Sequence, residues 1–208
     1  MTEAEWLAAT DPTPMLEFLR DKASVRKLRL TACACCYRIV HLLIRRKHEP
    51  CRRVVEVVEA VADGRASELL LPDAWEKARA ANGPFILNHT YACALTACVI
   101  QDNIVQIANY AALATGAVPG ERIEQCRLVR DIFGNPFRPV AVEPSWLTST
   151  VVQLAEGIYS DRAFDRLPIL ADALQDAGCD SDDILNHCRQ PGEHVRGCWV
   201  VDLLTGRE

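Results

Sequence analysis

Apolar residues recur every three or four positions along most of this chain, a spacing typical of amphipathic α-helices. Alternating β-branched runs, which would indicate strands, are scarce. Half of the 208 residues are hydrophobic and a quarter are charged, as in an ordinary globular protein. The sequence therefore predicts an all-α fold: one compact domain over residues 1–208, built as an array of about eight to ten helices.

Capping and breaking residues mark where the expected helices begin and end. Thr2 with Glu5 forms the pattern of a capping box, and Ser24 is a suitable N-cap. In the first half of the chain we expect a short helix carrying Trp6, a second that begins at Thr13-Pro14, and helices over residues 25–46, 50–61 and 66–81, the last with a candidate break at Pro72. A long apolar helix or pair of helices then ends near Gly116. Two further helices follow, one over residues 121–133 and one that begins at Pro144 and reaches Ile158.

The only long irregular stretch is residues 134–143, GNPFRPVAVE, in which two prolines forbid a helix. It is the candidate seam between subdomains. Its Phe137 and Arg138 are candidate partner-binding residues, because aromatic and arginine side chains dominate interface hot spots. The favoured alternative is that Phe137 fills the core and Arg138 ties a helix end.

The last third of the chain is the richest in helix signals. Asp165 is the expected N-cap of a helix that Gly178 ends, and Asp180 or Ser181 is the expected N-cap of the next helix. The two predict an αα-hairpin with a tight turn. Residues 199–204 fit either a short terminal helix or an extended strand.

Six segments of the chain resemble a large set of paralogous bacterial proteins associated with planctomycetes. The resemblance spans nearly the whole sequence and is weakest between about residues 66 and 115. It implies no particular activity, cofactor or site residue. The segments are MTEAEWL with TDPTPMLEFLR, LRLTACACCYRIVHLL, LVRDIFGNPFRPV, YSDRAFDRLPILADALQDAGC, DILNHCR and HVRGCWVVDLL.

Possible metal ligands gather between positions 179 and 198. His194 and Cys198 are four residues apart, a spacing found in zinc sites, and His187 and Cys179 are the further candidates. Cys188 follows His187 directly on a helix, so the two side chains point about 100° apart and cannot easily join one site. The simpler interpretation is that the cysteines pack in the core and the histidines hydrogen-bond the loop.

Signatures of catalysis are scarce. The sequence has no G-x-S-x-G, no H-E-x-x-H and no phosphate-binding glycine loop. Cys33-x-x-Cys36 lies within a predicted helix, where small core residues are the expected explanation. The one place for an acid–base pair is His187 or His194 against Asp202, so a protein without enzymatic activity is favoured.

Charge is distributed unevenly, since residues 20–53 hold eleven Lys/Arg and two acidic residues in a chain of net charge −5. This segment could contact phosphates. No recognition motif accompanies it, so nucleic-acid binding is not expected and pairing within the fold is favoured.

The N-terminal residues MTEAEWLAATDPTP do not form an export signal, and polar residues interrupt the longest apolar tract, residues 91–114. These features predict a cytoplasmic protein outside the membrane, with its ten cysteines reduced.

The leading hypothesis is a non-catalytic protein-interaction or regulatory module that has no built-in cofactor and binds a protein partner or a second copy of itself. Arg196, with its loop QPGEHVRGCW, is a further candidate contact. The second hypothesis is a zinc-stabilised module or small-molecule enzyme using residues 187–202. The third is a nucleic-acid binder acting through residues 20–53.

Overall fold

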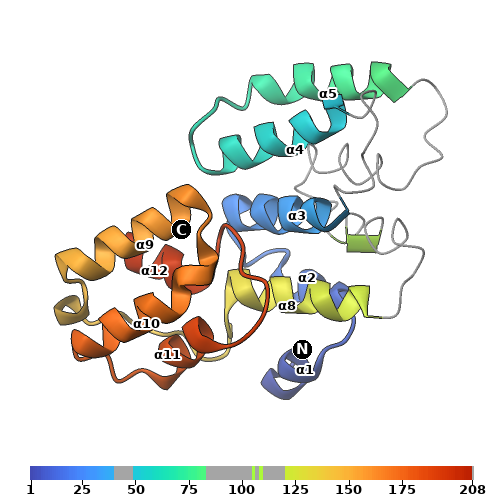
Figure 1. Cartoon of the computed structure of the whole chain (residues 1–208). Helices are drawn as coiled ribbons and strands as arrows, with labels where there is room; N and C mark the ends of the chain where they lie inside the picture. The colour runs from blue at the N-terminus through green and yellow to red at the C-terminus, as the bar shows by residue number, and fades with distance from the viewer. Residues whose placement is uncertain (40–48, 83–104, 106–107, 110–119, 208) are drawn as a thin grey trace. The chain divides into compact units, whose positions relative to one another are not determined.

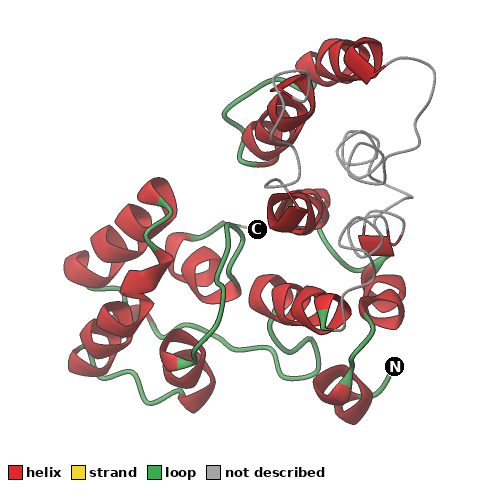
Figure 2. Ribbon diagram, turned by 45° about the vertical axis from the view of Figure 1, so that its right-hand side comes forward, coloured by secondary structure: helices red, strands yellow, loops and turns green. Residues whose placement is uncertain are grey.

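A computed structural model of the chain describes residues 1–39, 49–82, 105, 108–109 and 120–207. Within these residues it contains ten α-helices and no strand, which confirms the predicted all-α array (Figures 1 and 2). The chain divides into two compact units, Met1–Val129 and Arg130–Glu208. The sequence had placed its candidate seam a few residues later, at 134–143.

The helices of the first unit follow the predicted caps and breaks. Thr2 and Glu5 form the expected capping box, and the hydroxyl of Ser24 accepts a hydrogen bond from the amide of Lys27. The helices are α1 (Glu3–Ala8), α2 (Pro12–Leu19), α3 (Val25–Ile39), α4 (Glu49–Ala62), α5 (Leu70–Asn82) and α8 (Glu121–Phe133), whose last turn reaches into the second unit.

In the first unit α4 packs against both α3 and α5. Its buried valines lie on one face, as the helical spacing predicts. The predicted helix at 66–81 is wrong at its start: α5 begins at Leu70, and Pro72 lies in its first turn, where no fracture results. The end of the predicted helix 25–46 and nearly all of the long apolar helix before Gly116 lie outside the described residues.

The second unit is a small helical array around one core. Here α10 packs against α9 and α11, and α12 packs against α9. The core is formed by apolar residues from all four helices, among them Val151, Ile158, Leu167, Leu170, Leu174, Ile184, Val200 and Val201. The elements are η3 (Pro144–Trp146), α9 (Ser149–Asp161), η4 (Phe164–Arg166), α10 (Leu167–Asp176), α11 (Asp182–Arg189) and α12 (Trp199–Thr205).

Two boundaries in this unit differ from the prediction. The helix expected from Pro144 is split, because Leu147 leaves the helical region and Thr148 caps α9 by accepting a hydrogen bond from the amide of Val151. Asp165 does not cap α10; it lies inside the 3₁₀ turn η4. The αα-hairpin of α10 and α11 is confirmed, with Gly178 at φ 87° after the first helix.

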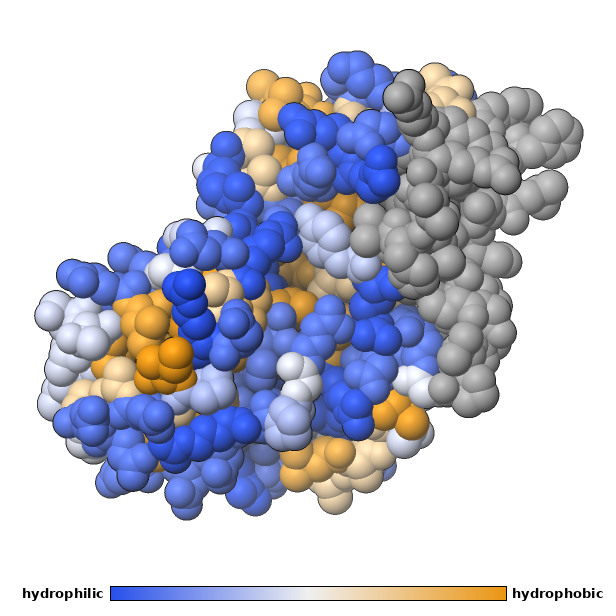
Figure 3. All heavy atoms as spheres, in the orientation of Figure 1, coloured by the Kyte–Doolittle hydropathy of each residue, from blue (hydrophilic) through white to orange (hydrophobic). Residues whose placement is uncertain are grey.

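On the face shown in Figure 3, hydrophilic residues cover most of the described surface, and apolar residues form small separate groups. None of the described helices combines the length and the apolar character needed to cross a membrane.

Gly134 brings the end of α8 against α12. Its φ of 63° lies in the left-handed region, which glycine adopts without strain. A Cβ at this position would lie 3.1 Å from the nearest ring atom of Trp199. Glycine is therefore required here both by backbone conformation and by the close approach of the indole.

Replacing Gly134 with alanine is expected to lower the free energy of unfolding by about 2 to 3 kcal/mol, from backbone strain together with the displaced indole. Gly178→Ala is the matched control, because Gly178 also has a positive φ but faces open space. Gly178→Ala is expected to lower the free energy of unfolding by only about 1 kcal/mol. Denaturant unfolding of the two variants measures both losses, and equal losses would contradict the role given to Trp199.

Candidate metal centre

Four potential metal-ligating side chains from four separate segments converge inside the second unit. Asp131 lies in the last turn of α8, His187 on α11, His194 in the following loop and Cys198 directly before α12. One ligand atom from each lies within 4.8 Å of all the others. We call these four residues the Asp–His–His–Cys cluster.

The contacts within the cluster centre on one carboxylate oxygen and one imidazole nitrogen. Oδ1 of Asp131 lies 2.5 Å from Nδ1 of His194 and 3.2 Å from Nε2 of His187. That same Nε2 lies 3.2 Å from Sγ of Cys198. The two imidazole rings meet nearly edge to face, with centroids 5.0 Å apart.

The cluster is shielded from water. The side chains of Asp131, His187 and His194 are 3%, 8% and 7% exposed, and Cys198 is fully buried. A charge in such a place is costly unless it is paired and hydrogen-bonded. The negative charge of Asp131 must therefore be neutralised by groups of the protein or by a bound cation.

Neighbouring groups hold the cluster in position. The amide of Val195 donates a hydrogen bond to Oδ2 of Asp131 at 2.9 Å, which leaves Oδ1 facing the two rings. The side-chain amide of Gln190 lies 3.1 Å from Nδ1 of His187. Either orientation of that amide fills the same space, so Gln190 can donate to Nδ1 or accept from it. Partners of this kind orient metal-binding histidines in known metal sites.

The pKa values describe a tight ion pair. Burial acts to raise the pKa of Asp131, but hydrogen bonds and charge interactions with His187 and His194 outweigh burial and lower the pKa below 3.8. Burial acts to lower the pKa of His194, but the Asp131 carboxylate outweighs burial and raises the pKa above 6.5. Each of the two groups thus favours the charged form of the other, the carboxylate of Asp131 and the imidazolium of His194.

The thiol of Cys198 is held in its protonated form. Burial and the negative charge of Asp131 raise its pKa well above 9.0. The backbone amides of Val201 and Val200, in the first turn of α12, act in the opposite direction. These amides could stabilise a thiolate once a cation neutralises Asp131.

The geometry does not fit a cysteine nucleophile. A catalytic histidine uses one ring nitrogen for the nucleophile and the other for the residue that orients it. Here the same Nε2 of His187 faces both Cys198 and Asp131. Reactive cysteines also have lowered pKa values and partial exposure, whereas Cys198 has a raised pKa and is buried.

The cluster could hold a tetrahedral metal ion if its ligand atoms, which all lie within 4.8 Å of one another, adjust their spacing. With bonds of about 2.0–2.1 Å to nitrogen and oxygen and about 2.3 Å to sulfur, ligand atoms lie about 3.3 to 3.7 Å apart. The two 3.2 Å contacts of His187 are close to this spacing. The 2.5 Å contact between Asp131 and His194 would have to widen by about 1 Å when a metal replaces the shared proton.

The structure brings together three of the four predicted metal ligands. His187, His194 and Cys198 belong to the cluster, whereas Cys179 does not, and Asp131 is the fourth member. Cys188 also lies outside the cluster, as its direction on α11 led us to expect. Asp202, the predicted partner of the histidines, is buried in α12, and the carboxylate that contacts both rings is Asp131.

The predicted partner-binding residues have local contacts. The buried Arg196 donates a hydrogen bond to the carbonyl of Ser160 and stacks over the ring of Tyr159 at 5.1 Å. The amide of Phe137 donates to the side chain of Asn135, and the Phe137 side chain is half-buried. Arg138 is exposed.

Several arginines in the described part of the basic segment form ion pairs within the first unit, whereas Arg45, Arg46 and Lys47 lie outside the described residues. Arg38 makes a bidentate contact with the buried Glu121. Further contacts join Arg26 to Asp63, Arg29 to Glu68, Arg52 to Glu49 and Arg53 to Glu56. For these five arginines the pairs are of the intramolecular kind that the sequence favoured.

Asp131 was the member that sequence reasoning missed. It lies next to the buried Ile132 and three residues after the buried Leu128, so it falls on the inner face of α8. Ile123, an apolar residue earlier in the same helix, is by contrast 40% exposed. An acidic residue at a core position is an available signal, because buried carboxylates are rare unless paired or metal-bound.

No protein-family model, curated protein or solved structure matches the chain. The resemblance to the planctomycete set remains an expectation, and the site rests on its geometry.

In the metal-free protein, Asp131→Asn is expected to lower the pKa of His194 and to cost about 3 kcal/mol of stability. The stability from the Asp131 carboxylate is present above pH 3.8 and is lost as pH falls through its lowered pKa. The stability from the protonated His194 ring is present below pH 6.5 and is lost as pH rises through the raised pKa of His194. The loss of unfolding free energy in Asp131→Asn should therefore be greatest at pH values between the titration of Asp131 and that of His194.

NMR titration of His194 and denaturant unfolding across pH measure both effects. Asp172→Asn is the matched control, because Asp172 is an exposed carboxylate paired with Arg189, and it is expected to cost under about 1 kcal/mol. An unchanged His194 pKa in Asp131→Asn would contradict the ion pair.

Proposed function

We propose that residues 130–208 form a zinc-stabilised, non-catalytic helical module, which serves as an interaction or regulatory unit in a reducing compartment. The observation that carries the proposal is the convergence of Asp131, His187, His194 and Cys198 within 4.8 Å. The proposal combines the interaction module and the zinc module that the sequence suggested.

The donor set favours zinc among divalent ions. Two imidazoles, one thiolate and one carboxylate are ligands that zinc accepts in a tetrahedron. Calcium and magnesium prefer sites composed of oxygen atoms, in higher coordination numbers. A thiolate with imidazoles also accommodates cobalt(II), which makes cobalt a useful spectroscopic substitute.

The proposed role of the ion is structural. Four protein ligands complete a tetrahedron, whereas catalytic zinc sites keep one position for water or substrate. The buried ligands support the same role. An ion held here would fasten the end of α8, α11, the following loop and the start of α12 to one another. Binding energy of this kind contributes directly to folding.

Purified protein is expected to contain one zinc ion per chain and to lose thermal stability when a chelator removes it. Cys198→Ala should abolish stoichiometric zinc. Cys188→Ala is the matched control: Cys188 is equally buried, neighbours His187 in sequence and lies outside the cluster. It should retain one zinc despite a packing loss. Elemental analysis and thermal unfolding, with and without chelator, measure these outcomes.

The proposal fails if wild-type protein prepared with zinc retains none. It also fails if the two alanine variants retain equal amounts of the metal.

A further inference from the structure

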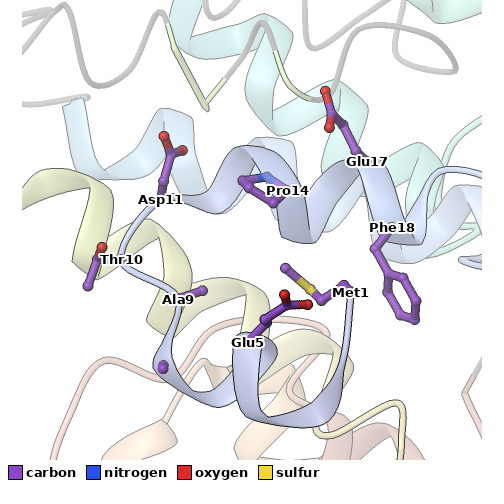
Figure 4. Close-up of a pocket in the computed structure, with 9 residues that line it drawn as sticks. Met1, Glu5, Ala9, Thr10, Asp11, Pro14, Glu17 and Phe18 are labelled. Atoms are coloured by element: carbon purple, nitrogen blue, oxygen red, sulfur yellow. The ribbon is translucent and has the colours of Figure 1, made fainter.

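An open pocket of about 710 Å³ lies between α1 and α2, but its charged groups do not define a ligand site (Figure 4). Glu5 is offset by hydrogen bonds of the capping box and by the N-terminal ammonium. Asp11 is paired with Arg122. Glu17 points away from both of these carboxylates (Figure 4). The feature that points further is Gln190, an exposed residue that contacts the buried Asp–His–His–Cys cluster.

Gln190 is held at the end of α11 by its neighbours in the chain. Its backbone amide donates a hydrogen bond to the carbonyl of Asn186. The following Pro191 disfavours the helical region for the residue before it, and Gln190 has an extended backbone with φ −65° and ψ 140°. Residues three positions apart lie on the same side of a helical turn, so the side chain of Gln190 reaches His187.

The contact uses the ring nitrogen of His187 that faces away from the cluster. The side-chain amide of Gln190 lies 3.1 Å from Nδ1 of His187. Nε2 of the same ring lies 3.2 Å from both Oδ1 of Asp131 and Sγ of Cys198. A neutral imidazole carries its proton on one nitrogen and accepts at the other. The hydrogen bond at Nδ1 therefore decides whether Nε2 offers a proton or a lone pair to the cluster.

A metal ion requires one of these two forms of the ring. The ion bonds to the lone pair of Nε2, so the proton must lie on Nδ1 and the amide oxygen of Gln190 must accept it. In the other form Nε2 donates to Asp131, and the amide nitrogen of Gln190 donates to Nδ1. A glutamine serves both forms, because a half-turn of its amide exchanges oxygen and nitrogen in the same space.

We propose that Gln190 is a positioning residue for the metal centre: by accepting a hydrogen bond from Nδ1, it presents the Nε2 lone pair of His187 to the ion. The inference rests on the proposed zinc site and deepens it, because it names an exposed residue that sets the metal affinity of buried ligands. Substitutions of an exposed side chain leave the core intact, so the role can be tested without unfolding the protein.

The zinc affinity of the full-length protein, measured by competition with a chromophoric chelator, tests this role. Gln190→Met removes both donor and acceptor but keeps a side chain of similar length. It should weaken zinc binding about tenfold, as the loss of a partner of a metal-bound histidine does. Gln190→Glu can only accept, so it favours the metal-binding form of His187 and should strengthen zinc binding at least about threefold. A residue that only packs would not produce opposite effects.

Asn186→Asp is the matched control for charge. It also adds one negative charge to α11, on an exposed side chain that points about 100° away from that of His187. At about 0.15 M salt it should change zinc affinity by less than about twofold. Long-range ¹H–¹⁵N NMR spectra of the zinc-loaded wild-type protein give a second readout, in which the protonated ring nitrogen of His187 should be Nδ1.

The inference is overturned, and the zinc site retained, if the wild-type protein binds zinc and Gln190→Met binds it equally tightly. The same conclusion follows if Gln190→Glu weakens binding as Gln190→Met does, if Asn186→Asp strengthens it as much as Gln190→Glu, or if zinc-loaded His187 is protonated at Nε2. If the wild-type protein binds no zinc, the proposed function and this inference fail together.

Discussion

The buried negative charge of Asp131 is the constraint on which the second unit depends. A carboxylate with 3% exposure cannot remain ionised unless positive charge and hydrogen-bond donors surround it. Two imidazole rings and the amide of Val195 supply these partners. The loop after α11 and the start of α12 are thereby fixed beside the last turn of α8, and a divalent cation would strengthen the same junction.

Several less polar contacts make this junction possible. Gly134 ends α8 with a left-handed turn that leaves room for the indole of Trp199. That indole lies 5.2 Å from the ring of His187 and limits its orientation. Cys198 stands at the amino end of α12, where backbone amides can stabilise a thiolate. Packing and electrostatics thus favour one arrangement, as in metal sites whose surroundings orient the ligands.

The helices were largely predictable from the sequence, because spacing and capping act over a few residues. The predicted bounds of α8 agree with the structure. Errors arose where two local signals compete, as at Thr148, which caps a helix expected to start at Pro144. The cluster was only partly predictable: His194 and Cys198 share a recognisable spacing, whereas Asp131 meets His194 from 63 residues away. No local pattern encodes a pairing of that length.

X-ray absorption at the zinc edge of the metal-loaded protein tests the central claim most directly, because it reports the ligand atoms themselves. The account predicts four-coordinate zinc with one sulfur at about 2.3 Å and three nitrogen or oxygen ligands at about 2.0 to 2.1 Å. A shell without sulfur, or one of six oxygen and nitrogen ligands, would contradict the assignment of Asp131, His187, His194 and Cys198 as the metal centre.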